Sequence, residues 1–393
     1  MNVLVCNVGS TSLKYQLFDM DTGAVLSKGG AERVGTAGSV FYVTDPASGE
    51  KKTAPLPLPT HLEAIGAMLS ALGGKKADCV AFKVVHARGV TGTQVLTDDV
   101  LAAMEAFNSV APAHNPPYLA AIRLFRKAMP DVPLIGAFET AFHADMPPEA
   151  KLYSIPVSLS RKYDIRRYGF HGASHEYLSR FAIARLGKEH TKIVTCHLGG
   201  SGSICAVRDG KSIDTSMGLS LQCGVMHNNR CGDLDPYIIF YLVEEAGMTL
   251  AEVKELLQTK SGFLGMTDGL YGDLRDVEAA AKSGNADAEN AIRSYAYSIR
   301  KYIGAYCAAL GGLDAVVFGG GIGTGSATVR RMALEGLECL CIRLDEEKNR
   351  AGAEDISQDG APVRIYLTET NEEWIVAQKA AALLKGETNE AKV

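Results

Sequence analysis

The chain has 393 residues, of which 47% are hydrophobic and 22% charged, the balance of a globular protein large enough for two domains. A formal net charge of −5 leaves no basic excess to neutralise nucleic-acid phosphates, so nucleic acid is not expected as a partner. No apolar run reaches the roughly 18 residues of a membrane span, and the N-terminus lacks the pattern of a signal peptide. The nine cysteines form no CxxC pair, which favours free thiols. We therefore expect a cytoplasmic protein with no membrane partner.

A glycine-rich loop follows the first expected strand, and similar loops follow two later strands. Glycine lets backbone N–H groups approach an anion closely, and Ser/Thr hydroxyls add further donors without bulk. A single loop of this kind can equally be an ordinary hairpin turn. Its recurrence in both halves of the chain favours a duplicated fold that binds phosphate. The three loops are Asn7-Val8-Gly9-Ser10-Thr11-Ser12, His197-Leu198-Gly199-Gly200-Ser201-Gly202-Ser203 and Gly319-Gly320-Gly321-Ile322-Gly323.

Strand-like and helix-like segments alternate along the chain, which predicts an α/β fold. Capping-box patterns at Thr60 and Thr249 open two helices, and the first should stop at Gly73-Gly74. An alanine-rich helix is expected over 286–310, closed by glycine, and a last helix from near Asn371 to about Leu384. The final residues, 390–393, have the composition of a frayed tail. Prolines interrupt the pattern near 137–150, where we place the domain boundary.

Eight segments, in order along the whole chain, resemble the acetate kinase family, which belongs to the sugar kinase, Hsp70 and actin superfamily. The match at Arg167–His175 is almost letter for letter. Each segment is weakly specific by itself, but their order and spacing together are highly specific. The segments are Val5–Tyr15, Ala113–Pro117, Arg167–His175, Asp214–Gly218, Arg230–Pro236, Asp273–Asp276, Gly320–Gly323 and Thr370–Glu373.

The resemblance implies two actin/Hsp70-like domains of the ribonuclease H type, which are copies of one βββαβαβα core, and a cleft between them. Residues 1–140 and 372–393 would form the N-terminal domain on the carboxylate side, with a returning C-terminal helix. Residues 141–371 would form the C-terminal domain on the nucleotide side. Family members are homodimers, so a homodimer is expected.

The implied activity is a reversible transfer of the γ-phosphoryl group of ATP to a short-chain carboxylate, giving ADP and an acyl phosphate. Mg²⁺ or Mn²⁺ would be required. Acetate is the preferred carboxylate, with propionate as an alternative. Two rival hypotheses stay open. In the first, the enzyme uses another carboxylate as the acceptor, or pyrophosphate instead of ATP as the phosphoryl donor. In the second, the chain is a catalytically weak paralogue that binds nucleotide in a regulatory role.

The resemblance also assigns site residues. Carboxylate and triphosphate are both anionic, so cationic groups must hold them together. The assigned catalytic residues are Glu139, His171 and Arg230, and the assigned metal ligands are Asn7 and Glu372. The carboxylate would contact Lys83, Val84, His114, Pro117 and Phe170. The nucleotide would contact Ser10, Ser12, Lys14, His197, Gly199, Gly200, Ser201, Gly202, Asp273, Leu274, Arg275, Gly320, Gly321, Ile322 and Gly323.

Most of these residues also have a plain structural interpretation. An isolated arginine is usually part of a surface ion pair, and a histidine such as His171 is equally often structural. Glu372 can be a helix N-terminal residue after Asn371 as N-cap, and Asp273 a helix cap. The glycines can form hairpin turns, and Val84, Pro117 and Phe170 can be plain core residues.

Four departures from the family pattern fall among these residues. The family's His-Arg-Val-Val-His is Phe82-Lys83-Val84-Val85-His86, so an arginine has become Lys83, while Arg88 could supply the lost guanidinium. An aspartate has become Glu139. The loop His-Leu-Gly-Asn-Gly is His197-Leu198-Gly199-Gly200-Ser201, and Met-Gly-Thr-Arg is His227-Asn228-Asn229-Arg230. We expect Lys83 and Glu139 to have changed as a compensating pair, with independent drift as the alternative.

Overall fold

The computed structural model describes residues 1–387, so the tail expected at 390–393 lies outside the described residues. The chain divides into two compact units. Unit 1 comprises Met1–Ala141 and the segment that begins at Asn371, and unit 2 comprises Phe142–Thr370. No helix within residues 1–387 is both long and apolar enough to cross a bilayer.

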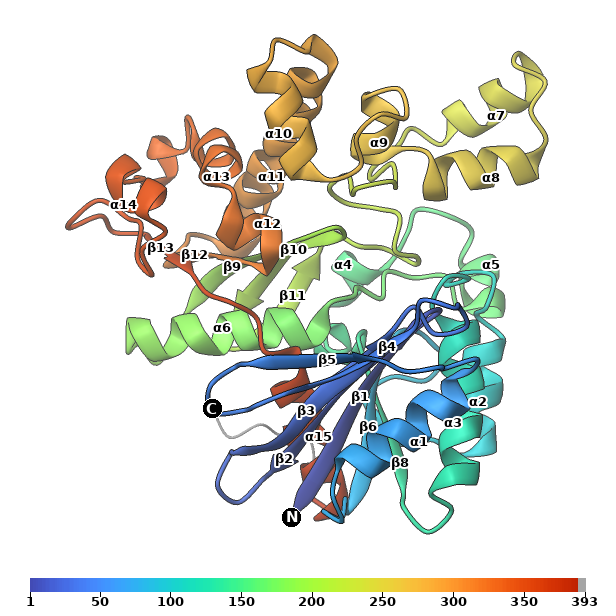
Figure 1. Ribbon diagram of the computed structural model, residues 1–393. Coiled ribbons are helices and arrows are strands. Elements are labelled where there is room, and N and C mark those ends of the chain that lie inside the picture. Colours follow the sequence, from blue (N-terminus) through green and yellow to red (C-terminus); the bar gives the residue numbers. More distant parts are fainter. Residues whose placement is uncertain (388–393) are drawn as a thin grey trace. The chain divides into compact units, whose positions relative to one another are not determined.

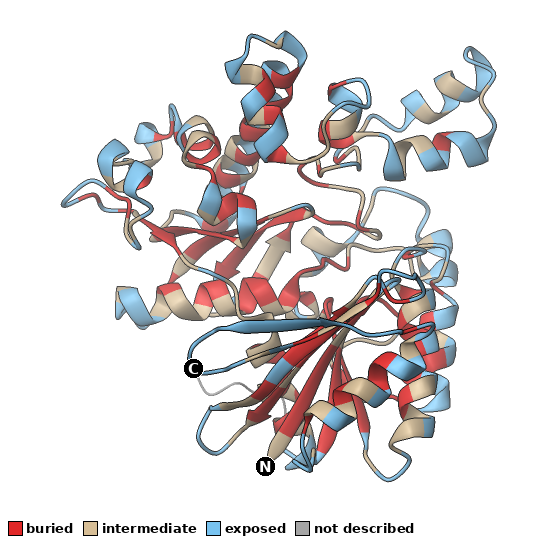
Figure 2. Ribbon diagram, in the orientation of Figure 1, coloured by how far each residue is buried: buried red, intermediate tan, exposed pale blue. Residues whose placement is uncertain are grey.

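Unit 1 is built on an eight-stranded sheet in the order β5-β4-β3-β2-β1-β6-β8-β7. Its strands are β1 (Asn2–Gly9), β2 (Ser12–Asp19), β3 (Val25–Glu32), β4 (Val40–Thr44), β5 (Lys51–Pro55), β6 (Cys79–Val84), β7 (Thr93–Val95) and β8 (Leu134–Phe138). Its helices are α1 (His61–Ala71), α2 (Asp98–Glu105), α3 (Asn115–Ala128) and α15 (Glu372–Leu384). Helices α1 and α3 pack on one face of the sheet and α15 on the other (Figure 1). The central strands are therefore buried on both faces (Figure 2).

Unit 2 is built on a five-stranded sheet in the order β11-β10-β9-β12-β13. Its strands are β9 (Lys192–Leu198), β10 (Gly202–Arg208), β11 (Lys211–Thr215), β12 (Ala315–Gly319) and β13 (Arg364–Leu367). Its helices are α4 (Pro148–Lys151), α5 (Val157–Tyr163), α6 (Gly172–Leu186), α7 (Tyr237–Glu244), α8 (Leu250–Thr259), α9 (Gly262–Met266), α10 (Leu274–Lys282), α11 (Ala286–Leu310), α12 (Gly320–Gly325), α13 (Ala327–Leu334) and α14 (Glu346–Ala351). Short 3₁₀ turns lie at Ala141–His143 and Glu338–Leu340. Helices α6 and α11 both pack against the strands of this sheet.

The two sheets share one topology. In each, three antiparallel strands run consecutively, β1-β2-β3 in unit 1 and β9-β10-β11 in unit 2. In each, the first strand then pairs in parallel with a later strand, which pairs in parallel with a further one: β1-β6-β8 and β9-β12-β13. This repeat confirms the prediction of a duplicated α/β fold of the ribonuclease H type.

Local signals set most of the helix boundaries. Thr60 and Thr249 each close a capping box at the start of α1 and α8, as their spacing to Glu63 and Glu252 predicts. Helix α11 spans Ala286–Leu310 and ends at Gly311, whose φ of 67° places it in the left-handed region. Helix α15 runs over Glu372–Leu384. These four predictions are confirmed.

The expected glycine turn at 320–323 is wrong. Strand β12 ends at Gly319, and Gly320–Gly325 form helix α12 directly after it. Gly320 has φ +77°, and a Cβ there would lie 2.6 Å from the carbonyl oxygen of Leu198 in β9. The close approach of α12 to β9 therefore requires a glycine at this position.

Candidate functional site

In unit 1, polar and charged side chains gather at the carboxyl ends of three neighbouring parallel strands. Asn7 lies near the end of β1 and Lys83 near the end of β6, while Glu139 follows β8 directly. The backbone N–H of Glu139 donates to the carbonyl of Val84 at 2.9 Å, which fixes the start of this loop beside β6. The carboxyl edge of parallel strands is where α/β sheets bind ligands. Three of the expected site residues thus share one edge.

Lys83 joins two carboxylates. Its Nζ lies 2.8 Å from Glu372 Oε2 and 3.2 Å from Glu139 Oε1, and Glu139 is 5% exposed. Burial alone would lower the pKa of the Lys83 ammonium, but Glu372 and Glu139 outweigh it and hold that pKa well above its ordinary value. Lys83 is therefore a permanent cation between two residues that sequence reasoning assigned to the metal and to catalysis.

Tyr118 of α3, which sequence reasoning missed, completes this edge. Its hydroxyl donates to Asn7 Oδ1 at 2.7 Å, and burial raises the pKa of that hydroxyl well above its usual value. His114, at the N-cap of the same helix, and Pro117 in its first turn lie at 114–117, directly before Tyr118. Tyr118 was foreseeable only as a core residue, because helical spacing alone does not show that its hydroxyl reaches β1.

The oxygen ligands of this edge fit a magnesium ion in kind. Two carboxylates and the Asn7 amide oxygen are the ligand types that Mg²⁺ accepts, and Mg²⁺ usually keeps waters and substrate phosphates besides. Within residues 1–387 no group of three or more His, Cys, Asp or Glu side chains is placed to hold a metal. Asn7, Glu139 and Glu372 would therefore hold Mg²⁺ only together with water or phosphate oxygens.

In unit 2, a chain of hydrogen bonds ends at His171. Its Nδ1 lies 2.8 Å from Ser203 Oγ, which lies 2.7 Å from His175 Nε2. His175 Nδ1 lies 2.8 Å from Thr195 Oγ1, and that hydroxyl donates to the carbonyl of Cys205. Burial, followed by neighbouring histidines, holds the pKa of His175 well below its usual value, so the ring is neutral.

The donor and the acceptor of each of these hydrogen bonds follow from the last bond, between Thr195 and Cys205. Because the Thr195 proton goes to a carbonyl, Thr195 accepts from His175 Nδ1–H, and the neutral ring then accepts from Ser203 at Nε2. Ser203 in turn accepts from Nδ1–H of His171. In this arrangement His171 carries a proton on Nδ1, and the charge of its ring depends on whether Nε2 is protonated as well.

His171 is positioned by its backbone as well. It is the N-cap of α6 with φ 58°, an uncommon conformation for a residue with a Cβ. Its ring lies 4.3 Å from that of His197, and His197 Nδ1 lies 2.7 Å from Ser174 Oγ. The structure thus brings two expected site histidines, His171 and His197, into contact. Strained backbone at such a position is typical of functional sites.

The turn between β9 and β10 carries the expected phosphate loop. Gly199 N–H donates to Ser201 O at 3.0 Å, and Gly200 is exposed at the tip. In the segment 227–230 that follows later, Arg230 Nη1 donates to the carbonyl of Leu221 at 2.7 Å. Since β9 and β12 are parallel, with His197 opposite Gly319, this loop and the start of α12 lie at the same edge of the sheet.

The remaining expected residues have mainly structural environments. Asp273 caps α10 by accepting from the N–H of Arg275, and the Arg275 guanidinium, followed by that backbone bond, lowers the pKa of Asp273 to about 2. Val84 and Phe170 are fully buried in the cores of their own units. Ser10, Lys14 and Arg88 are exposed, whereas Ser12 is partly buried.

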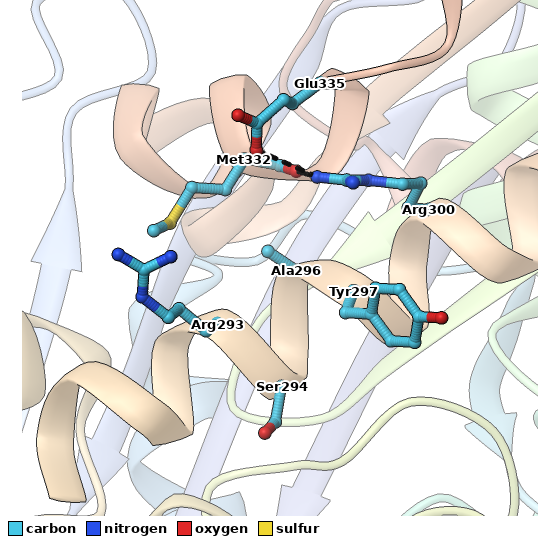
Figure 3. Close-up of a pocket in the computed structure, with 7 residues that line it drawn as sticks. All are labelled: Arg293, Ser294, Ala296, Tyr297, Arg300, Met332 and Glu335. Carbon is cyan, nitrogen blue, oxygen red and sulfur yellow. Dashed lines mark hydrogen bonds and ion pairs between the residues drawn. The ribbon is translucent and has the colours of Figure 1, made fainter.

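A surface pocket of about 350 Å³ lies elsewhere in unit 2, between α11 and α13 (Figure 3). Arg293, Tyr297 and Arg300 line it from α11, and Met332 and Glu335 from the region of α13. Arg300 pairs with Glu335, and Arg293 with Glu289. These surface ion pairs account for the charges of the pocket. None of the expected site residues lines it.

The two units therefore define the class of duplicated ribonuclease H-type folds, with polar side chains at the carboxyl edge of each parallel core. Within that class, the sequence matches the model of the Acetokinase family over residues 2–378. The chain belongs to the acetokinase family and is a phosphotransferase that acts on a carboxyl group.

Individual relatives agree with this assignment. The acetate kinases of Natranaerobius thermophilus and Bacteroides fragilis are each 42% identical over 398 aligned positions, covering 98% of this chain and 100% of the relative. The crystal structure of Porphyromonas gingivalis acetate kinase matches with a TM-score of 0.87 at 36% identity, over 98% of this chain and 99% of that one. A propionate kinase from Francisella tularensis matches with a TM-score of 0.89 at 32% identity, over 96% and 98%.

Proposed function

We propose that this enzyme transfers the γ-phosphoryl group of ATP reversibly to acetate, forming acetyl phosphate and ADP in the presence of Mg²⁺ or Mn²⁺. The full-length similarity to acetate kinases carries this proposal. An acetate oxygen attacks the γ-phosphorus, and the bond from that phosphorus to the β,γ-bridging oxygen breaks with its electron pair on ADP. No phosphoenzyme is required. Propionate is the second candidate, because a propionate kinase shares the fold over 96% of this chain.

Unit 1 supplies the carboxylate site in this proposal. The Lys83 ammonium has three N–H donors, and contacts with Glu139 and Glu372 account for two of them. The third N–H would bind a substrate carboxylate oxygen. One lysine and two ionised glutamates carry a net charge of −1, which repels an incoming carboxylate. A divalent cation held by Asn7, Glu139 and Glu372 would reverse that sign and would screen charge on the transferring phosphoryl group.

Unit 2 supplies the phosphoryl-donor site. The backbone of Gly199–Gly202 would bind phosphate oxygens, and the 273–275 and 320–323 segments the nucleoside. Arg230 and a protonated His171 would stabilise charge on the transferring phosphoryl group. The hydrogen-bond chain through Ser203 keeps Nδ1 of His171 protonated, so protonation at Nε2 makes the ring a cationic donor.

The test is trapping of acyl phosphate as hydroxamate, with carboxylates of two to four carbons and with ATP or pyrophosphate as donor. Acetate with ATP and Mg²⁺ should give the highest kcat/KM. Arg230→Ala should lower kcat by about 10²-fold, the loss typical of one such donor, with unchanged circular dichroism. A folded protein that binds ATP and yields no hydroxamate would instead be a regulatory nucleotide-binding paralogue.

We also infer that the enzyme is a cytoplasmic homodimer. All nine cysteines are free thiols, which supports a reducing compartment. Helix α7 has no buried residue although seven of its eight residues are apolar or aromatic, and Tyr237 and Tyr241 are 75% and 67% exposed (Figure 2). A second copy would cover this face by presenting the same patch to it.

A further inference from the structure

The turn at Gly200 is covered by the side chain of Asn228. The backbone N–H of Asn228 donates to the carbonyl of Gly200 at 3.0 Å, which holds the two segments together. A Cβ at Gly200 would lie 3.2 Å from Asn228 Nδ2 and 3.6 Å from its Cγ. The Asn228 amide therefore lies where a side chain on residue 200 would begin.

Three buried polar atoms of these two segments have no hydrogen-bond partner: Ser201 Oγ, His227 Nε2 and Asn228 Oδ1. His227 is 1% exposed, and its Nδ1 accepts from the N–H of Gly202 at 3.0 Å. Burial, followed by the charge of Arg230, lowers the pKa of His227 to about 3, so the neutral ring carries its proton on Nε2. Each such unsatisfied group costs about 1–3 kcal/mol. Ser201 Oγ–H and His227 Nε2–H are thus donors without an acceptor in the two segments that the bond between Asn228 and Gly200 joins, and an anion could supply that acceptor.

The departures at 200 and 228 are reciprocal. The family pattern has asparagine where this chain has Gly200, and glycine where this chain has Asn228. An asparagine at 200 would crowd the Asn228 amide, since contacts of 3.2 Å are tighter than ordinary van der Waals distance. A chain can therefore place an amide at this turn from either segment, but not from both without a shift. Taken alone, the change at 200 looks like the loss of an amide. The contact between the two positions indicates instead that the amide has moved from residue 200 to residue 228.

We propose that the Asn228 amide serves, through Nδ2–H, as the phosphate donor at this turn in place of a side chain on residue 200, with Ser201 Oγ–H and His227 Nε2–H as further neutral donors, and that the three recognise the terminal phosphates of the phosphoryl donor. The proposal rests on the phosphoryl-transfer function above. Neutral donors and backbone N–H groups suit phosphate oxygens, because they bind the anion without an ion pair that would have to be broken at each turnover.

The position of Asn228 is fixed by contacts of the 227–228 backbone with helix α9. The carbonyl of Asn228 accepts from Leu264 N–H at 2.8 Å, and that of His227 accepts from Phe263 N–H at 3.0 Å. Gly262, with φ +65°, leaves no room for a Cβ, which would lie 2.1 Å from the carbonyl of His227. Helix α9 thus holds the segment rigidly against the turn, as a phosphate-recognising amide requires.

The test is calorimetric binding of ATP, pyrophosphate and AMP to the full chain without a carboxylate. Asn228→Ala should weaken ATP and pyrophosphate about 10-fold or more, the loss of one hydrogen bond to a charged group, and leave AMP unchanged. Asn228→Asp, which keeps the shape but adds negative charge, should weaken both further. Asn229→Ala, at the exposed neighbouring position, is the matched control and should bind like the parent. Equal weakening of AMP would place Asn228 at the nucleoside and overturn the proposal.

The exchange itself is tested by a double-mutant cycle. Gly200→Asn and Asn228→Gly should each weaken ATP binding, the first by crowding and the second by loss of the amide, and the double variant should regain most of the affinity. A double variant no better than the worse single variant would overturn the exchange. Because the readout is binding, it is independent of turnover. A parent that makes no acyl phosphate contradicts the proposed function, whereas ATP affinity unaltered by Asn228→Ala contradicts this inference alone.

Discussion

At the scale of single residues, the departures from the family pattern fall into contacting pairs. Lys83 lies 3.2 Å from Glu139, and Gly200 lies against Asn228. Arginine at 83 would bring a longer planar fork into the space of Glu139, and aspartate at 139 would end one methylene short of Lys83 Nζ. The contact therefore supports compensation over independent drift for the first pair.

This gives a prediction for kcat/KM. Lys83→Arg and Glu139→Asp should each lower it by about 3- to 10-fold, corresponding to roughly 1 kcal/mol of coupling between residues in contact. The double variant should recover a good part of the loss. Hydroxamate assays on the four proteins give the cycle. If both single variants are faster than the parent, the two positions drifted independently and compensation is ruled out.

The identity of these residues could be predicted from the sequence, but their contacts could not. Motif matches pointed to Lys83, Glu139 and Glu372, yet only the fold shows that one ammonium joins both acids, since the three lie on a strand, on a loop and on a helix that are far apart in the sequence. No role was assigned from the sequence to Tyr118, His175, His227 or Asn228, because the hydrogen bonds and contacts of their side chains depend on the fold.

At the scale of elements, helix boundaries could be predicted where the sequence carries a capping motif or a terminating glycine. Capping boxes gave the starts of α1 and α8, and Gly311 the end of α11. The same reasoning failed at α12, because a run of glycines has little helix propensity and is typical of turns. The conformation of this segment depends on the packing of Gly320 against the β9 backbone. That contact is tertiary, so the neighbouring residues in the sequence do not reveal it.

Gly320→Ala should therefore destabilise the junction of β12 and α12. The substitution forces a Cβ into a left-handed conformation and to within 2.6 Å of the Leu198 carbonyl, a strain of at least about 1 kcal/mol. The melting temperature and the ATP affinity should both fall. Gly325→Ala is the matched control in the same helix, because nothing lies within 4 Å of a Cβ there. Equal melting temperatures for the two variants would show that the close approach is not required.

The hydrogen-bond chain between α6, β9 and β10 predicts a pH dependence of stability. His175 is held neutral with a pKa well below 6.5, whereas in the unfolded chain it takes up a proton below about pH 6.5. The stability it contributes is therefore complete above pH 6.5 and is lost as the pH falls below that value, at up to about 1.4 kcal/mol per pH unit for one proton.

His175→Gln should accordingly have a smaller drop in melting temperature between pH 7 and pH 5 than the parent, although it starts lower. His190→Gln removes a histidine side chain that is exposed and serves as the control. Scanning calorimetry at the two pH values measures the difference. An identical drop in His175→Gln and the parent would mean that the buried ring is not the group that titrates.

At the scale of the whole molecule, the duplicated topology was predictable because the sequence repeats its strand–loop–strand pattern, and the structure confirms it in both sheets. The carboxylate and nucleotide roles of the two units stay a prediction from the family. The interface that we propose on α7 could not be derived from the sequence, since the apolar residues of α7 look like those of an ordinary core helix.

Helix α7 carries the last prediction. Phe240 and Tyr241 are 53% and 67% exposed, and Glu substitutions there would place charge in a face that a second copy should bury. Phe240→Glu with Tyr241→Glu should therefore convert the protein from a dimer to a monomer of 41.8 kDa in light scattering after gel filtration. Leu62→Glu, on an exposed position of α1, should remain dimeric. Because both side chains are exposed, the monomer should keep its fold by circular dichroism, which separates lost association from unfolding. A parent that already runs as a monomer, or a double variant that stays dimeric, would show that α7 is not the interface.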